Sequence, residues 1–373
     1  MPRENGSGDR RNARSAPTAK DVAMLAGVST ATVSRVVSGD SAVSAKTVAK
    51  VTKAIKELSY HPNAISRALR SRHSRSIALV IADVENPFIT AIIRGVETVA
   101  RAKGYSLLLF NSDEDPEREA LNLQTAKESR PAGVLITPVD EAVSVDVFVS
   151  DGVPVVAIDR PLSTDGSDSV VVETRWAARR SVEHLRATGR TRIALITGPR
   201  LTFTADERFQ GWREGLGEIE DYESLIRYTD FKVEGGWAAT HSLFEQKSPP
   251  DGLVVANSLL TVGALRALRE LGLSIYKEVG FVAFDDAPWT GLIGAPLSIV
   301  KQPAFEMGEQ AARLLFERIE GIGASVSQTI TLHPTLAFVR DEIPLEPETD
   351  EAVRSESSVS NPPRSTAQAP LRM

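Results

Sequence analysis

The stretch TAKDVAMLAGVSTATVSRVVS, residues 18–38, decides how the front of this chain folds and what it contacts. Thr18 and Asp21 have the spacing of a helix N-cap and its partner. Gly27 can adopt the left-handed backbone of a tight turn, and Ser29 can cap a second helix that runs from Thr30 to about residue 38. The first helix has an apolar side made of Val22, Ala23, Leu25 and Ala26. Two short helices joined by a three-residue turn predict a helix-turn-helix.

The second helix of such a motif enters the DNA major groove with its first turn foremost. Val33 is expected to be the apolar plug between the two helices. The side chains expected to contact bases or phosphates are Thr18, Ser29, Thr30, Ala31, Thr32, Ser34 and Arg35. The alternative is an ordinary helical hairpin, but the mutually consistent offsets of the caps, the glycine and the small residues favour DNA binding.

These residues resemble the amino-terminal domain of the lactose-repressor/galactose-repressor (LacI/GalR) family of bacterial transcription regulators. The resemblance includes a third helix, about residues 44–58, and the link Tyr60-His61-Pro62-Asn63 into a short hinge helix. In that family a leucine of the hinge helix wedges into the central base step of the minor groove, and Leu69 occupies the matching position. The expected hinge contacts are Asn63, Arg67, Leu69 and Arg70. An apolar wedge between cations suits a kinked minor groove, although a solvated linker helix is the alternative.

The charge distribution supports a DNA-binding role for the front of the chain alone. Residues 1–76 hold 14 Lys and Arg against 5 Asp and Glu, whereas the whole chain has 43 against 49. The remaining residues therefore carry 29 against 44 and are acidic. A basic front end on an acidic protein is expected when only the front faces phosphate.

Several classes of protein are disfavoured by composition. The leader has no signal-peptide core, and no run of roughly 18 apolar residues occurs, so a cytoplasmic protein outside the membrane is expected. The chain has no cysteine and five histidines, which argues against disulfides and metal sites. Gly215-Leu216-Gly217 lacks the third glycine of a nucleotide loop, and no G-x-S-x-G occurs. No catalytic residue and no cofactor are therefore expected.

From residue 76 onward, apolar strand-like runs alternate with amphipathic helices. Strands are predicted over 77–81, 106–110, 133–136 and 153–158, with helices over 88–103, 116–129 and 141–150. A second set of strands is predicted over 170–172, 193–197, 228–231, 252–256 and 279–284. Two successive doubly wound parallel α/β units are therefore expected. Ligands bind such sheets beyond the carboxyl ends of the strands, so the expected site is the cleft between the units.

The family resemblance continues to about Arg340 and implies a periplasmic-binding-protein-like core of two lobes joined by three crossings. Candidate polar contacts follow the ends of predicted strands, and Phe88, Trp237 and Trp289 are candidate stacking faces. In the family, an arginine matching Arg208 grips effector hydroxyls or a carboxylate, and an aspartate matching Asp285 contacts hydroxyls. The expected effector-binding residues are Asn86, Phe88, Asp159, Arg208, Trp237, Asn257, Asp285, Trp289 and Gln302. Amides, a carboxylate, an arginine and aromatic faces suit a polyol.

Purely structural interpretations stay open for several of these residues. Asn86 and Asn257 can simply cap helices, Arg208 can be a surface ion-pair partner, and Trp237 can pack a helix on its sheet. The chain also departs from the family pattern. It has Glu173-Thr174 where many members have Asp-Asn at the first crossing, and Asn257-Ser258 where Asn-Asp is usual.

The predicted domain organisation has five parts. A disordered basic leader covers 1–16, the headpiece 17–61, the hinge 62–75, the two-lobed core 76–341 and a disordered tail 342–373. Within the core, lobe 1 is expected over about 76–172 and 304–330, and lobe 2 over about 173–303 and 331–341.

The leading hypothesis is a sequence-specific transcription regulator, a repressor by expectation, controlled by a sugar or nucleoside. Its expected partners are a near-palindromic double-stranded DNA operator, the small-molecule effector and a second copy of itself, because one headpiece offers too little surface for tight specific binding. A DNA-binding protein without an effector is the alternative. A transport sugar-binding protein would share the core but not the headpiece. The identity of the effector and the sign of its action stay open.

Overall fold

The computed structural model describes residues 17–37, 42–58, 60, 75–140, 142–164, 166–218, 221–275, 277–294, 297–322, 326–338 and 341–344. The predicted leader, the four hinge contacts Asn63, Arg67, Leu69 and Arg70, and the tail beyond residue 344 lie outside these ranges. The chain divides into two compact units: residues 1–75 with 129–131, and the remainder.

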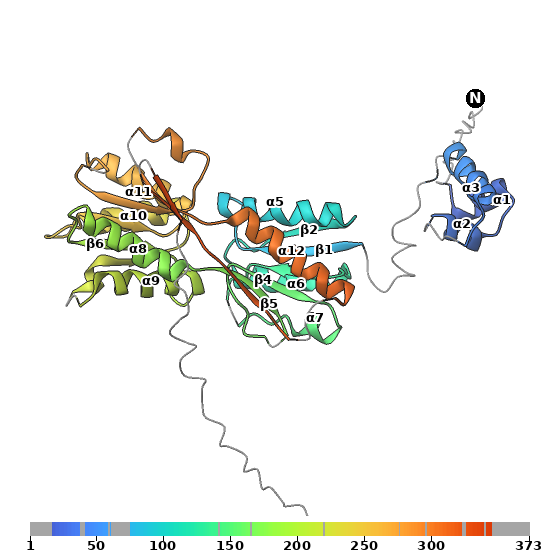
Figure 1. Ribbon diagram of the computed structural model, residues 1–373, viewed down its shortest axis with the longest axis horizontal. Coiled ribbons are helices and arrows are strands. Elements are labelled where there is room, and N and C mark those ends of the chain that lie inside the picture. Colours follow the sequence, from blue (N-terminus) through green and yellow to red (C-terminus); the bar gives the residue numbers. More distant parts are fainter. Residues whose placement is uncertain are drawn as a thin grey trace, which may run out of the picture. The chain divides into compact units, whose positions relative to one another are not determined.

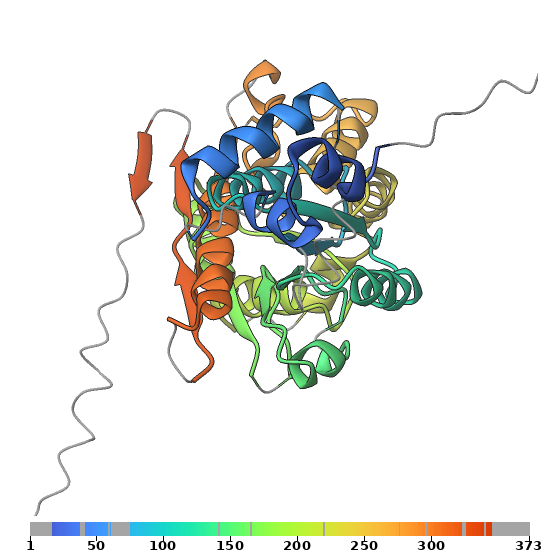
Figure 2. The ribbon, with the colours of Figure 1, turned by 90° about the vertical axis from the view of Figure 1, so that its right-hand side faces the viewer.

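The first unit contains the three predicted helices of the headpiece, drawn in blue in Figures 1 and 2. They are α1 (Ala19–Ala26), α2 (Thr30–Val37) and α3 (Ala45–Glu57). Thr18 and Asp21 form a capping box: the Thr18 backbone N–H donates to the Asp21 carboxylate at 2.8 Å, and the Asp21 N–H donates to the Thr18 hydroxyl at 3.4 Å. Gly27 has φ 66° and ends α1, and the Thr32 N–H donates to Ser29 Oγ at 3.1 Å. The predicted helix-turn-helix is confirmed in its caps and its turn.

The headpiece has a small core of its own. Its buried members are Val22, Ala23, Ala26, Val33, Val51 and Ala54. Val33 is the predicted plug. The placement of Leu25 on the buried side of α1 was wrong, because its side chain is 49% exposed. Three helices this short leave room for only one buried stripe on α1, and that stripe runs through Val22, Ala23 and Ala26.

The second unit contains two mostly parallel sheets, one in each lobe (Figure 1). The lobe 1 sheet has the order β11-β5-β4-β3-β1-β2, and the lobe 2 sheet has the order β13-β12-β10-β9-β8-β6-β7. The lobe 1 strands are β1 (Ser76–Ile81), β2 (Ser106–Asn111), β3 (Val134–Ile136), β4 (Val155–Ile158), β5 (Asp168–Val172) and β11 (Thr329–Leu332). The lobe 2 strands are β6 (Ile193–Thr197), β7 (Ile226–Tyr228), β8 (Gly252–Val255), β9 (Gly280–Phe284), β10 (Ser298–Lys301), β12 (Thr335–Phe338) and β13 (Asp341–Pro344). The predicted fold class is confirmed.

Helices cover the lobe 1 sheet on both faces. Alternate residues of β1 divide between two hydrophobic clusters: Leu79 packs with α5 and α12, and Val80 packs with α6 and α7. In lobe 2, α8 packs against α9, α10 packs against α11, and two short 3-10 helices complete the lobe. The bounds are α5 (Pro87–Ala102), α6 (Pro116–Glu128), α7 (Asp146–Ser150), α8 (Thr174–Ala187), α9 (Phe203–Leu216), η1 (Tyr222–Leu225), α10 (Val233–Phe244), α11 (Ser258–Glu270), η2 (Thr290–Leu292) and α12 (Ala304–Glu320). Among the described residues, no helix is long and apolar enough to cross a bilayer.

Three crossings join the lobes, and they share one margin of the two sheets. They follow β5 at residue 173, β10 at residues 302–303, and β11 at residues 333–334. The strands that directly adjoin them, β5, β11, β10 and β12, are on the β11/β5 side of the first sheet and the β12/β10 side of the second. The opposite margins, β1/β2 and β6/β7, have no crossing.

Several predicted boundaries were wrong. The strand predicted over 170–172 was grouped with the second set of strands, but β5 pairs with β4 and β11 in lobe 1, in agreement with the predicted lobe 1 limit at residue 172. The strand predicted over 228–231 is β7, Ile226–Tyr228, followed by the polar Thr229 and Asp230. The helix predicted over 141–150 is only α7, Asp146–Ser150, and ahead of it the Asp140 carboxylate accepts from the Ala142 N–H at 2.8 Å.

Two limits near the carboxyl end also differ. The predicted change of lobe after residue 330 cuts through β11, which pairs with β5 along its whole length from Thr329 to Leu332. The tail predicted as disordered from residue 342 begins instead with β13, which pairs antiparallel with β12 (Figure 2). Pro344 ends this edge strand, where a missing backbone N–H is tolerated.

Candidate nucleic-acid interface and ligand cleft

The candidate DNA-reading surface is the outer face of α2. Ser29, Thr30, Ala31 and Arg35 are exposed, and Ser34 is half-buried on the same face. Thr32 differs from them because both its polar groups contact Ser29. Its hydroxyl lies 2.9 Å from Ser29 Oγ, and its backbone N–H donates to that oxygen. Thr18 is exposed at the start of α1 with its hydroxyl bonded to Asp21 at 2.6 Å. The structure therefore leaves the first turn of α2 open to a partner.

The candidate ligand cleft contains two aspartates at equivalent places in the two lobes. Asp159 follows β4 and Asp285 follows β9, and each has a left-handed backbone, with φ 69° and 73°. The N–H of Asp159 donates to Val170 O at 2.9 Å, and that of Asp285 donates to Val300 O at 3.0 Å. Non-glycine residues held in this conformation mark places where the surrounding fold imposes the backbone. Each lobe thus fixes one carboxylate at the end of its fourth strand.

Arg208, on α9, carries its positive charge near these two carboxylates. Its side chain is buried and its guanidinium lies 4.8 Å from the centre of the Phe284 ring. Burial lowers the pKa of Arg208, while Asp285 and then Asp159 act in the opposite direction. Burial also raises the pKa of Asp159, and it raises that of Asp285 to about 6. The surface ion-pair interpretation of Arg208 does not fit its burial.

Gln302, at the second crossing, completes this group. Its side-chain N–H donates to Asp285 Oδ1 at 2.6 Å, which leaves its own oxygen buried without a partner. Asp159 Oδ1 and Arg208 Nε are likewise buried and have no hydrogen-bond partner among the described residues. The structure therefore brings together four of the nine predicted effector residues, namely Asp159, Arg208, Asp285 and Gln302.

Two threonines at strand ends have the same property and were missed from the sequence. Thr137 follows β3 and Thr197 ends β6, both are fully buried, and both hydroxyls lack a partner in the described part of the chain. Each is the polar residue that closes an apolar run, Val134-Leu135-Ile136-Thr137 and Ile193-Ala194-Leu195-Ile196-Thr197. A polar residue directly after an apolar run was therefore the sequence signal that could have identified these two threonines.

Asn86 and Asn257 act as helix caps. Asn86 Oδ1 accepts from the Phe88 N–H at 3.0 Å. Asn257 Oδ1 accepts from the Leu260 N–H at 2.7 Å, and its amide N–H donates to Phe231 O at 3.1 Å. The polar atoms of Asn257 are thus used inside lobe 2, as the capping interpretation expects. Phe88 lies in the first turn of α5, buried in the lobe 1 core.

The two predicted tryptophan faces have different surroundings. Trp289 is half-buried in the loop after β9, three residues beyond Asp286. Trp237 is engaged between α10 and α11: its indole N–H donates to Glu270 Oε2 at 2.7 Å, and Arg266 lies over its ring at 5.5 Å. Glu270 ends α11, whereas Ser258, whose backbone N–H bonds to Asp285, begins that helix. The structure does not bring Trp237 to the other candidates.

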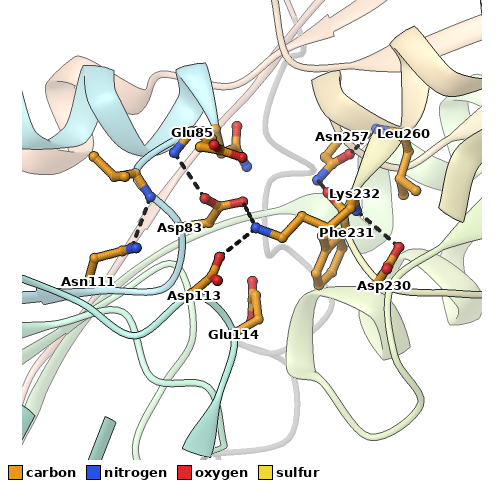
Figure 3. A network of polar contacts seen from close by, with 12 residues as sticks. Asp83, Glu85, Asn111, Asp113, Glu114, Asp230, Phe231, Lys232, Asn257 and Leu260 are labelled. Atoms are coloured by element: carbon orange, nitrogen blue, oxygen red, sulfur yellow. Dashed lines mark hydrogen bonds and ion pairs between the residues drawn. The ribbon is translucent and has the colours of Figure 1, made fainter. Parts of the chain in front are cut away.

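Further ionic contacts, within lobe 1 and between the lobes, come from residues outside the predicted effector-binding set. Arg160 is buried and donates to both carboxylate oxygens of Glu114, at 2.8 and 2.6 Å, and to Pro138 O at 3.0 Å. Lys232, from lobe 2, reaches Asp83 Oδ2 at 2.9 Å and Asp113 Oδ1 at 2.7 Å in lobe 1 (Figure 3). Lys232 and Asp83 are 149 residues apart, so no local pattern could have paired them.

The two departures from the family pattern have structural correlates. Glu173 precedes α8, and its carboxylate lies 3.4 Å from His333 Nδ1, so it joins the first crossing to the third. Ser258 is fully buried, and its hydroxyl lies 3.4 Å from Asn86 Oδ1 in the other lobe. Its backbone N–H also lowers the pKa of Asp285, against the larger effect of burial.

These two parts define a class of protein: a helix-turn-helix unit for DNA joined to a two-lobed core with buried, unpaired polar atoms at its cleft. Comparison with known families agrees. Residues 18–63 match the bacterial regulatory proteins of the lacI family, and residues 74–337 match the periplasmic binding proteins and sugar binding domain of the LacI family.

Individual relatives match most of the chain. The ribose operon repressor of Bacillus subtilis (strain 168) is 33% identical over 298 residues, which cover 80% of this chain and 90% of that protein. That of Escherichia coli (strain K12) is 34% identical over 309 residues, or 81% and 93%. Among solved structures, the lac repressor dimer bound to operator and the anti-inducer ONPF has a TM-score of 0.76 at 28% identity, covering 87% of this chain and 98% of that one. The chain belongs to the LacI family and is a DNA-binding transcriptional regulator.

Proposed function

We propose that the protein is a repressor whose affinity for its operator is controlled by an uncharged sugar or nucleoside bound between the two lobes. The observation that carries this proposal is a group of five buried polar atoms that have no hydrogen-bond partner in the described part of the chain and that lie at strand ends, on α9 or at the second crossing. They are Thr137 Oγ1, Asp159 Oδ1, Thr197 Oγ1, Arg208 Nε and Gln302 Oε1. A buried group left unpaired costs about 1–3 kcal/mol, and the hydroxyls of a sugar can both donate to the carboxylate and amide oxygens and accept from the arginine.

Charge favours an uncharged ligand over a sugar acid or a sugar phosphate. The two buried arginines among the described residues already have carboxylates beside them: Glu114 for Arg160, and Asp285 with Asp159 for Arg208. A ligand carboxylate or phosphate would lie in a cleft that already contains Asp159 and Asp285. Like charges at low dielectric repel strongly. A neutral polyol avoids that repulsion.

The relatives and the headpiece support the remaining parts of the proposal. Two relatives bear the name ribose operon repressor, which makes D-ribose the first compound to test. The lac repressor in its operator complex is a dimer. We therefore propose that Thr30, Ala31, Ser34 and Arg35 contact the operator. We also propose that the protein binds a near-palindromic site as a homodimer. Its proposed location is the cytoplasm, and the nucleoid when it is bound to DNA. The assignments of Asn63, Arg67, Leu69 and Arg70 to the minor groove remain predictions. The chain is proposed to have no catalytic activity.

The test is calorimetric titration of the full-length protein with ribose, other neutral pentoses and hexoses, nucleosides, sugar acids and sugar phosphates. A neutral compound should bind, and it should change the mobility shift of the upstream DNA. Asp285→Asn should weaken that affinity about tenfold or more, since it removes a charged hydrogen-bond acceptor. The matched control is Asp286→Asn, because the neighbouring aspartate is exposed and pairs with Lys301 at 3.4 Å.

Binding confined to the acids or phosphates would contradict the charge argument. Operator binding that is indifferent to every compound would favour a DNA-binding protein without an effector. Equal losses in the Asp285 and Asp286 variants would show that the cleft has been misplaced.

A further inference from the structure

Lys232 joins the two lobes at the margin farthest from their crossings. Its ammonium lies 2.9 Å from Asp83 Oδ2 and 2.7 Å from Asp113 Oδ1 (Figure 3). Lys232 follows β7, the edge strand of its sheet, whereas Asp83 and Asp113 follow β1 and β2, the last two strands of theirs. The three crossings lie on the opposite margin of both sheets. If the lobes open about those crossings, these three residues must separate by more than any residue near the crossings.

Contacts within lobe 2 fix the backbone around Lys232, and its ammonium binds carboxylates of lobe 1. Its backbone N–H donates to Asp230 Oδ1 at 3.2 Å, and the preceding carbonyl, that of Phe231, accepts from the Asn257 amide at 3.1 Å. In lobe 1, the Asp83 side chain is only 4% exposed and also accepts from the Glu85 N–H at 2.9 Å. A preorganised pair of this kind loses less side-chain entropy than a surface ion pair.

The electrostatics of the contact show that Lys232 is charged. Partial burial lowers the pKa of Lys232, but hydrogen bonds to Asp113 and Asp83 outweigh it and hold the pKa above its usual value. The bond to Lys232 is likewise the largest cause that lowers the pKa of Asp113. Asp113 also pairs with Arg118 at 3.1 Å within lobe 1. Loss of Lys232 therefore leaves Asp113 with a cationic partner, but it leaves Asp83 with none among the described residues.

A second contact lies next to the first one. The guanidinium of Arg160, from lobe 1, lies 5.5 Å from the centre of the Phe231 ring. Phe231 can lie there because residue 198 is glycine, where a Cβ atom would be 1.9 Å from the ring. Two consecutive residues of lobe 2, Phe231 and Lys232, therefore contact three charged side chains of lobe 1.

We propose that Lys232, through its bridge to Asp83 and Asp113, is a positioning residue that holds the two lobes closed and thereby increases the affinity of the cleft for its ligand. The predicted effect on ligand affinity rests on the proposed function, whereas the predicted effect on the distance between the lobes does not. A bridge of charges makes closure depend on ionic strength even when the ligand is uncharged. If the ligand binds the closed form, a larger population of the open form lowers the apparent affinity for the ligand.

The closure can be measured without any ligand. The chain has no cysteine, so Gln124→Cys on α6 and Ala238→Cys on α10, both exposed, accept one spin label in each lobe. Labelled full-length protein, diluted with unlabelled protein, then gives the distance between lobes by pulsed electron resonance. Lys232→Met should lengthen or broaden this distance, and Lys232→Arg should restore it. The control is Lys103→Met, which breaks a 2.7 Å pair with Glu320 inside lobe 1.

The affinity for ribose, or for whichever neutral sugar binds, is the second readout. Lys232→Met should weaken it about tenfold or more, Lys232→Arg should keep it within a few fold, and Lys103→Met should leave it unchanged. Raising sodium chloride from about 0.05 M to about 0.5 M should weaken it in the parent protein and not in Lys232→Met. Asp113→Asn provides a second variant, at a half-exposed position, in case Lys232→Met does not fold.

An unchanged distance distribution in both Lys232→Met and Asp113→Asn overturns the inference. A longer distance in a protein that binds no sugar at all supports the bridge and overturns the proposed function instead. Equal effects of Lys103→Met and Lys232→Met would show a general loss of stability, and would also overturn it.

Discussion

At the scale of single residues, burial decides which side chains carry chemistry. Asp159 and Asp286 illustrate this, because both follow strands closely but only Asp159 is buried with an unpaired oxygen. Glu119, on α6, is another buried carboxylate. Its side chain is 1% exposed and accepts from the Val139 N–H at 2.8 Å. Burial, opposed by that hydrogen bond, raises the pKa of Glu119 to about 7.

We predict that Glu119 makes the stability of the protein fall as the pH rises from about 4.5 to about 7. In that window the folded state holds a proton that the unfolded state has lost, so the free energy of unfolding decreases with pH. Glu119→Gln removes this contribution and keeps an oxygen for Val139. Its stability relative to the parent protein should therefore increase by about 1–3 kcal/mol between about pH 5 and about pH 8. Urea unfolding at a series of pH values measures this, and parallel profiles for the two proteins would refute it.

At the scale of elements, short helices depend on their caps and strand ends depend on their neighbours. The capping box of α1 is local: it needs only Thr18, Asp21 and the backbone between them. The strand ends of the core behave differently. Thr229 and Asp230 follow β7, and their position depends on the neighbouring strand β6, whose Thr197 carbonyl accepts from the Thr229 N–H, and on Asn257, which donates to the carbonyl of Phe231.

We predict that Thr18→Ala destabilises the headpiece by about 1 kcal/mol, the usual effect of losing an N-cap side chain. Operator affinity should fall with it, because α1 supports α2 through the buried Val22 and Val33. Thr18→Ser keeps the hydroxyl and should retain both properties. The measurements are thermal unfolding of the full-length protein, followed by a probe in the headpiece, and a mobility shift. A loss of operator affinity with no change of headpiece stability would show that Thr18 contacts DNA directly.

At the scale of the whole molecule, two units with separate cores carry separate tasks. The headpiece cluster contains only residues 22–60, and the three clusters of the core contain only residues from 77 onward. Charge follows the same division, with the basic surplus at the front and the acidic surplus behind it.

We predict that a fragment starting at residue 75 folds and binds the same neutral sugar as the full chain, within about threefold, and does not bind operator. The reason is that its hydrophobic clusters and its unpaired cleft atoms all come from its own residues. Calorimetry and mobility shift on the fragment check this. Loss of sugar binding in a folded fragment would show that the headpiece contributes to the ligand site.

Much of this protein was predictable from its sequence because the signals are local. The caps Thr18 and Ser29, the turn at Gly27, and apolar runs such as Ile193-Ala194-Leu195-Ile196 depend on neighbours within a few residues. They predicted the helix-turn-helix, the two α/β lobes and a ligand cleft at the strand ends. The strand-end argument predicted Asp159, Asp285 and Gln302 as cleft residues, because parallel strands bring their carboxyl ends to one edge, whereas Arg208 was predicted from the family resemblance.

Only the tertiary structure decided which of those polar residues remain free for a ligand and which charges join the lobes. Asn257 ended a predicted strand as convincingly as Asp285, yet its polar atoms are used by Leu260 and Phe231. Trp237 is engaged by Glu270 on the next helix, and Lys232 pairs with Asp83 from the other lobe, 149 residues away. Hydrogen bonds and ion pairs depend on distances of a few ångströms between segments far apart in the chain, and only the packing of the whole core fixes those distances.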